Sequence, residues 1–151
     1  MNVSFAAPVD APDMAAVHAQ AFDKPWDETD FEDLLDGEGI FGVVARDPGP
    51  AGVLICRAVA GEAEVLTVGV ATTSRRRGIA RALMEMAISR ARSMQALEMF
   101  LEVDVASSGA VALYTGLGFV QTGLRRGYYD RGAAGLADAL VMRLDLTKPP
   151  N

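Results

Sequence analysis

The stretch from Glu64 to Met94 restricts the fold more than any other part of this chain. It begins with a short apolar run, at residues 64–70, that is typical of a buried strand. After a loop that contains Arg-Arg-Arg-Gly at 75–78, apolar side chains recur with helical spacing from Ile79 to Met94. A strand joined by a short loop to an amphipathic helix indicates an α/β fold, in which helices cover a sheet.

The remaining segments extend this pattern in both directions. Apolar runs bounded by Gly, Pro or Asp predict strands, and segments with helical spacing that open on Asp, Thr or Ser predict helices. In chain order these are a strand at 3–5, helices at 13–22 and from 27 or 29 to 35, strands at 41–45 and 52–59, the strand and helix above, a strand at 100–105, a helix at 107–117, and strands at 119–120 and 139–144. This order predicts a single α/β domain over residues 1–151, with a mixed sheet flanked by helices.

The composition indicates an ordered globular protein. Half of the 151 residues are hydrophobic and 23% are charged, which favours one ordered core over disorder. The one cysteine, Cys56, lies in an apolar run, so we expect a core thiol without an internal disulfide, consistent with a reducing compartment. No apolar stretch approaches the roughly 20 residues that span a bilayer, and residues 1–5 do not resemble a signal peptide. We therefore expect a cytoplasmic protein that does not bind membranes.

Charge is unevenly distributed along the chain. The net charge of −6 argues against non-specific binding of nucleic acid. Ten of the 20 acidic residues precede position 39, where Lys24 is the only basic residue, whereas positive charge gathers at 75–92 and 125–131. The acidic third is either a solvated helix face or a surface that attracts a basic partner.

The loop before the helix at 79 has the features of an anion-binding site. Small residues at Gly78 and Ala80 let the backbone approach a ligand, and the first N–H groups of a helix lack intrahelical acceptors. Arg75, Arg76 and Arg77 add charge to that positive helix end. The loop lacks both the Gly-Lys-Ser/Thr of a P-loop and the three glycines of a dinucleotide fold, so a phosphate ligand other than ATP, GTP or a dinucleotide is favoured. The alternative is that the arginines form only a solvated helix end.

Two motifs carry a resemblance to a known family. The pattern basic-x-x-Gly-x-Ala, after a strand and opening a helix, resembles the acetyl-CoA loop of the GNAT superfamily of acyltransferases. The run Ala112-Leu113-Tyr114-Thr115-Gly116-Leu117-Gly118-Phe119 is similar to a second signature of that superfamily. The resemblance implies a sheet that splays into a V at the strand 62–70, with acetyl-CoA as the acetyl donor.

The same resemblance implies which residues hold the donor. They are the strand residues Val68, Gly69 and Val70, the loop and helix residues Arg75, Arg76, Arg77, Gly78, Ile79, Ala80 and Arg81, and Ser107. Ser107 stands where the family commonly has asparagine, which offers the donor a shorter group. Gly69 is expected to suit an irregularity in the strand backbone.

Two residues are implied in the chemistry. An amine is mostly ammonium at neutral pH, so Glu102 would accept its proton, directly or through water. Tyr114 would protonate the departing thiolate, because a phenol with a pKa near 10 stays protonated at neutral pH. Without the resemblance, Tyr114 would be assigned to the core, since it shares a helix face with Ala110 and Leu117, and Glu102 would be an exposed or paired strand residue.

A longer series of matches points to one branch of the superfamily. Residues 21–27, 101–103, 125–129 and 137–142, together with the Tyr114 motif, resemble the bacterial enzymes that acetylate the N-terminal alanine of a small-subunit ribosomal protein. The implied acceptor is the basic N-terminal peptide of that protein. The acidic residues from Asp27 to Glu38 would steer this peptide, and Tyr128 and Tyr129 would flank it.

Three alternatives stay open at this point. In the first alternative, the acceptor is a small amine, an antibiotic or a protein lysine. In the second, the domain is a non-catalytic module that binds CoA. In the third, Arg75 to Arg77 contact nucleic acid, which the acidic net charge opposes. No metal is expected, because His18 is the only histidine and has no cysteine companion in its helix. We therefore expect a structural role for His18.

Overall fold

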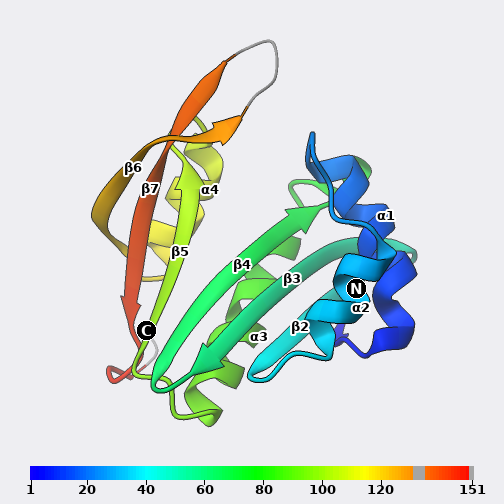
Figure 1. The fold of residues 1–151 in the computed structure, drawn as a ribbon, viewed down its shortest axis with the longest axis horizontal. Coiled ribbons are helices and arrows are strands. Elements are labelled where there is room, and N and C mark those ends of the chain that lie inside the picture. Colours follow the sequence, from blue (N-terminus) through cyan, green and yellow to red (C-terminus); the bar gives the residue numbers. More distant parts are fainter. Residues whose placement is uncertain (131–134, 150–151) are drawn as a thin grey trace.

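The computed structural model describes residues 1–130 and 135–149 and contains one seven-stranded sheet with four α-helices in that part of the chain (Figure 1). The elements are β1 (Asn2–Phe5), α1 (Ala11–Ala21), α2 (Glu28–Leu35), β2 (Ile40–Arg46), β3 (Pro50–Val59), β4 (Glu62–Val70), α3 (Ile79–Ser93), β5 (Glu98–Asp104), α4 (Ser108–Gly116), β6 (Val120–Asp130) and β7 (Leu136–Asp145), with 3-10 turns at Pro8–Asp10 and Thr72–Ser74. The strand order is β1-β2-β3-β4-β5-β7-β6, and only β4 and β5 pair in parallel. The prediction of a mixed α/β sheet flanked by helices is confirmed.

Helices lie on both faces of the sheet, and this explains the continuous apolar run of β3. Val53 and Ile55 point into a cluster with residues of α1 and α2, whereas Leu54 and Cys56 point into the larger cluster with α3 and α4. A strand covered on both faces is apolar at every position, because successive side chains alternate between the two layers. Cys56 is a buried free thiol, as expected from the sequence.

The sheet opens into a V between β4 and β5, as the family resemblance predicts. These strands pair at only three positions, where Glu62, Ala63 and Glu64 lie opposite residues 98 to 100. Beyond Glu64, β4 continues along β3 to Val70, and β5 continues along β7 to Asp104 (Figure 1). The edge of β4 that faces the opening therefore has backbone groups that β5 does not pair.

A bulge in β4 lies where the strands part. Ile55 is opposite Thr67 and Cys56 is opposite Val65, which leaves Leu66 as an extra residue. Such a bulge disrupts the alternation of side chains, so Leu66 and Thr67 both face α1.

The expectation of an irregularity at Gly69 is wrong, because Gly69 pairs regularly with Val53. The close approach of the end of α1 favours a small residue there. A β-carbon at position 69 would lie 3.0 Å from Cε2 of Phe22 and 3.1 Å from Cβ of Ala21.

The last two strands are longer than the sequence indicates. We expected strands at 119–120 and 139–144, whereas β6 extends to Asp130 and β7 begins at Leu136. Residues 121–130 lack an alternating apolar pattern because β6 is an edge strand, exposed at most of its described positions. Its conformation is set by pairing with β7, which a local sequence pattern does not report.

Candidate active site

The loop before α3 presents an open helix N-terminus. Gly78 is the N-cap residue and has a φ of +75°, in the left-handed region that favours glycine. The first intrahelical bond runs from the N–H of Ala82 to the carbonyl of Gly78 (3.1 Å), so the N–H groups of Ile79, Ala80 and Arg81 have no acceptor one turn back. Among the described residues, no side chain caps this end, and a β-carbon on Gly78 would meet no atom within 4 Å. The backbone of this helix end is therefore accessible, and its role in holding an anionic ligand stays a prediction.

The arginines of this loop are not equivalent. All three are exposed, but Arg77 Nη1 lies 3.5 Å from Oδ2 of Asp47, and Arg81 Nε lies 3.9 Å from Oε1 of Glu85. Within residues 1–130 and 135–149, Arg75 and Arg76 form no ion pair. Of the four predicted cations, these two have the most charge available for a phosphate ligand.

Glu102 lies on β5 at the opposite wall of the V. Its neighbours Leu101 and Val103 are buried in the core on the side of α3 and α4, so the Glu102 side chain projects from the other face of the sheet. It is 22% exposed, and Arg125 Nη1 donates a hydrogen bond to its Oε1 at 2.5 Å. This bond raises the pKa of Arg125 above its ordinary value. Glu102 is thus a held carboxylate on an accessible face.

Tyr128 completes a small group around Glu102. The guanidinium carbon of Arg125 lies 4.0 Å from the centre of the Tyr128 ring. Burial raises the pKa of the Tyr128 phenol, and the charge of Glu102 and a hydrogen bond to it act in the same direction. The sequence predicts for Tyr128 only a place beside an acceptor peptide, and it does not predict the contact of Arg125 with Glu102. The side chain of Tyr129, the other predicted peptide neighbour, lies outside the described part of the chain.

A bulge in β6 determines how Arg125 and Tyr128 lie. Arg125 pairs with Ala139 and Tyr129 pairs with Ala137, so three residues of β6 stand opposite Asp138 alone. Gly127 has a φ of +62°, and its N–H donates to Oδ1 of Asp138 at 2.8 Å. The family motif at 125–129 placed this segment in the site. The way in which β6 pairs with β7 depends on the contact of Gly127 with Asp138, which the residues around either position do not reveal.

Tyr114 is a core residue of α4. Its side chain is 5% exposed and packs edge to face on Phe119, with ring centres 6.0 Å apart. Burial raises the pKa of Tyr114 to about 12, so the phenol keeps its proton throughout the neutral range. Tyr114 belongs to the cluster that contains Leu101 and Val103, and it therefore faces the opposite side of β5 from Glu102. The structure does not bring these two side chains into contact with each other.

The sequence of this chain matches a known protein family over most of its length. The model of the Acetyltransferase (GNAT) family matches residues 11–119. The chain belongs to the GNAT family of acetyltransferases. It is therefore an N-acetyltransferase that uses acetyl-CoA.

Relatives of this GNAT enzyme extend over nearly its whole length. The [ribosomal protein bS18]-alanine N-acetyltransferase of Salmonella typhimurium is 30% identical over 146 residues, which cover 97% of this chain and 98% of that protein. The N-alpha-acetyltransferase RimI of Mycobacterium tuberculosis is 36% identical over 147 residues, covering 93% and 89%. The crystal structure of the ribosomal-protein-S18-alanine N-acetyltransferase from Escherichia coli superposes with a TM-score of 0.88 at 28% identity, covering 99% of this chain and 96% of that one.

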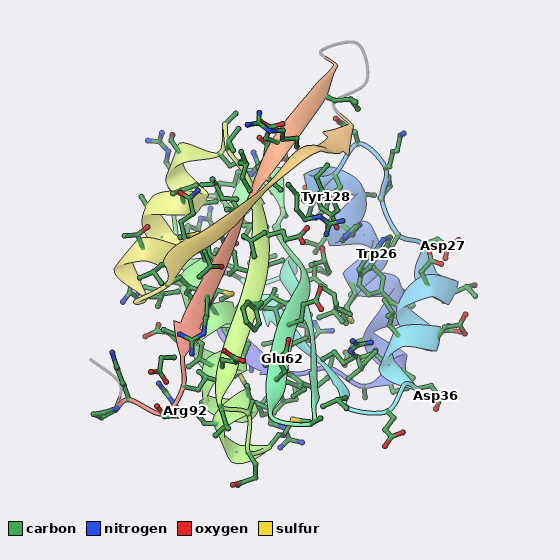
Figure 2. All side chains as sticks on the ribbon, turned by 60° about the vertical axis from the view of Figure 1, so that its left-hand side comes forward. Trp26, Asp27, Asp36, Glu62, Arg92 and Tyr128 are labelled. Atoms are coloured by element: carbon green, nitrogen blue, oxygen red, sulfur yellow. The ribbon has the colours of Figure 1, made fainter. Side chains whose placement is uncertain are left out.

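The acidic N-terminal third of the GNAT domain divides into two groups. Asp10 and Asp13 both accept hydrogen bonds from Arg46 Nη2, at 2.8 and 2.9 Å. The acidic residues of α2 and its ends remain exposed instead, and Figure 2 shows Asp27 and Asp36 at the two ends of that helix. Asp27 caps α2, since its Oδ1 accepts from the N–H of Asp30 at 2.9 Å. The second group is thus the acidic surface that is available to a partner.

Within the described residues, no group of three or more His, Cys, Asp or Glu side chains is arranged to hold a metal ion. In the same part of the chain, no helix combines the length and apolarity that crossing a membrane requires.

Ser107 is the exposed N-cap residue of α4, and its side chain makes no capping bond within the described residues.

Proposed function

We propose that this GNAT enzyme acetylates the N-terminal alanine of a small-subunit ribosomal protein by direct transfer. The observation that carries the proposal is the placement of Glu102 and Tyr114 on the two faces of β5, where this strand parts from β4. A carboxylate that projects from one face of β5 and a protonated phenol that packs on the side of its other face would provide a proton acceptor and a proton donor. The full-length similarity to bS18-alanine N-acetyltransferases supports the choice of acceptor.

The donor-binding half of the site would be β4 and the start of α3. The open N–H groups of Ile79, Ala80 and Arg81, with the charges of Arg75 and Arg76, fit the pyrophosphate of acetyl-CoA. The bare Gly78 leaves room for close approach. The backbone of Val68 to Val70 would bind the pantetheine arm along the edge that β5 leaves unpaired, and Ser107 would offer a hydroxyl.

Acetyl-CoA supplies an activated acetyl group, and the chain supplies proton transfers and orientation. Glu102 would accept the proton of the substrate ammonium, which leaves the nitrogen lone pair free to form the new C–N bond. A backbone N–H of β4 would stabilise the negative charge that develops on the carbonyl oxygen. As the C–S bond breaks, Tyr114 would give its proton to sulfur. Arg125 and Tyr128 would hold the Glu102 carboxylate in place.

The acceptor-binding half would combine the acidic surface with the group around Glu102. Ribosomal protein tails are basic, and the exposed carboxylates of α2 would raise the local concentration of such a tail. Tyr128 is 46% exposed beside Glu102 and offers a ring against which an extended peptide can pack. The ring of Tyr128 favours an extended basic peptide over a small cationic amine, since the acidic surface alone would attract both.

The test measures release of free CoA with a panel of acceptors. One peptide begins Ala-Arg, its control is the same peptide with a blocked α-amine, and a third has an internal lysine only; a polyamine and an aminoglycoside represent small amines. We expect kcat/KM for the first peptide to exceed that for every other acceptor by at least about 100-fold, the range over which positioning discriminates. Faster turnover of a lysine peptide or a small amine would contradict the proposed acceptor, and CoA binding without any turnover would indicate a non-catalytic module.

A further inference from the structure

His18 is buried in the GNAT domain and makes two specific hydrogen bonds. It lies in the last turn of α1 and is 3% exposed. The backbone N–H of Trp26 donates to its Nδ1 at 2.9 Å, and its Nε2 lies 3.0 Å from Oγ1 of Thr67. Because Nδ1 is occupied as an acceptor, the ring proton is on Nε2, which donates to Thr67. The two bonds therefore require one tautomer of a neutral imidazole.

Aromatic side chains enclose this imidazole. The rings of Phe22 and Trp26 stack on it, with centres 4.2 and 5.0 Å away and interplanar angles of 26° and 16°. Phe31 of α2 meets it edge to face at 5.4 Å. Residues 22–27, which join α1 to α2, are thus folded around His18, with both a backbone bond and ring contacts.

The other bond of His18 reaches the part of β4 that opens the V. Thr67 directly follows the extra residue of the bulge and precedes Val68. Beyond Glu64, β4 is not paired with β5, so this stretch lacks a strand neighbour on that side. His18 supports it from the face that α1 covers, and Figure 2 shows that Trp26 and Tyr128 belong to the same side of the molecule.

We propose that His18 is a positioning residue that fixes the loop 22–27 relative to β4 and thereby places the acceptor peptide against the donor. One nitrogen holds the strand that would bind acetyl-CoA, and the other holds the loop on the acceptor side. The inference rests on the proposed function in assigning this loop to the acceptor. A distorted loop should weaken peptide binding and leave acetyl-CoA binding intact.

Two substitutions of His18 each remove one of its two hydrogen bonds and keep the other. The amide of Gln reaches the position of Nε2, so His18→Gln keeps the contact to Thr67 and loses the acceptor for Trp26. The amide of Asn overlaps Nδ1, so His18→Asn keeps the acceptor and loses the contact to Thr67. Both remove the same ring stacking, which makes each the control for the other.

The readouts are KM for the peptide, KM for acetyl-CoA and the fluorescence of Trp26, the only tryptophan in the chain. Losing one hydrogen bond in His18→Gln should raise the peptide KM about tenfold. It should also red-shift the emission of Trp26, while the KM for acetyl-CoA stays within about twofold. His18→Asn keeps the bond to Trp26 but loses the anchor on β4, so it should also raise the peptide KM about tenfold, while the emission of Trp26 stays close to wild type.

An unchanged peptide KM in His18→Gln, or equal rises of both KM values in both variants, would overturn the proposal. Thr67→Val is the further variant if His18→Gln does not fold; a peptide KM that stays at the wild-type value there would also overturn it. If the wild type prefers another amine, the proposed acceptor fails, but KM for that amine and the Trp26 emission still decide the role of His18.

Discussion

Removing the hydroxyl of Tyr114 should separate catalysis from stability. The Tyr114→Phe variant keeps the ring that packs on Phe119 and deletes only the proposed proton donor. Within the described residues, the Tyr114 hydroxyl forms no hydrogen bond to a protein group. Its loss therefore leaves no buried group unpaired, and the free energy of unfolding should change by less than about 1 kcal/mol.

The catalytic effect should be much larger. A positioned general acid contributes roughly 10²- to 10⁴-fold, which corresponds to about 3–5 kcal/mol in the activation barrier. Because burial raises the pKa of Tyr114 to about 12, the wild-type donor is protonated from neutral pH to about pH 10. The loss in kcat should accordingly be constant between about pH 6 and 10.

The assay follows CoA release at saturating peptide, alongside thermal unfolding. Tyr114→Phe should lower kcat at least about 100-fold, change the KM for acetyl-CoA little, and move the Tm by less than about 4 °C. Tyr114→Leu is the control for packing and should lower the Tm by more, because the ring contacts are lost. A kcat within threefold of wild type, or a loss that varies with pH, would refute the role of Tyr114 as the acid.

Three further predictions address Glu102, His18 and Gly78. Glu102→Gln should reduce activity most near pH 7, where an α-amine of pKa about 8 is mostly protonated, and least near pH 9.5. A ratio of variant to wild-type activity that stays constant across this pH range would argue against Glu102 as a base. The pKa of His18 is lowered to about 4, mainly by burial, so the unfolded state takes up the proton first as pH falls. Urea titrations should show the free energy of unfolding decreasing from about pH 6.5 to 4, by up to about 3 kcal/mol. The decrease with pH should be smaller in His18→Gln, and an equal decrease in the variant and the wild type would contradict the role of His18 in it. Gly78→Val should raise the dissociation constant of CoA in calorimetry, because a branched side chain would enter the open backbone face and strain a φ of +75°; unchanged binding would remove the loop from the donor site.

Local patterns predicted the fold up to α4 with small errors in boundaries. The helix from Ile79 was placed by its apolar spacing and by Gly78, and both signals are local in the chain. The V-shaped opening and the candidate pair Glu102 and Tyr114 came from the family resemblance. Apolar spacing alone would have left Tyr114 in the core, where the structure indeed buries it.

The parts that sequence could not supply depend on register and on contacts distant in the chain. The bond between Arg125 and Glu102 requires the pairing of β6 with β7, and the bulge at Gly127 depends on the carboxylate of Asp138. The bulge at Leu66 likewise appears only when β4 is aligned with β3. His18 was expected to be structural, but a lone histidine in a helix does not reveal partners 8 and 49 residues away.

Mapping the acetyl group on a doubly reactive peptide tests the central claim most directly. The peptide begins Ala-Arg and carries one internal lysine, so a single molecule offers both amines to the enzyme. After incubation with acetyl-CoA, fragment-ion mass spectrometry should find the acetyl group on the α-amine and none on the lysine, with the product lost in Tyr114→Phe. An acetyl group on the lysine, or an unmodified peptide, would contradict the account.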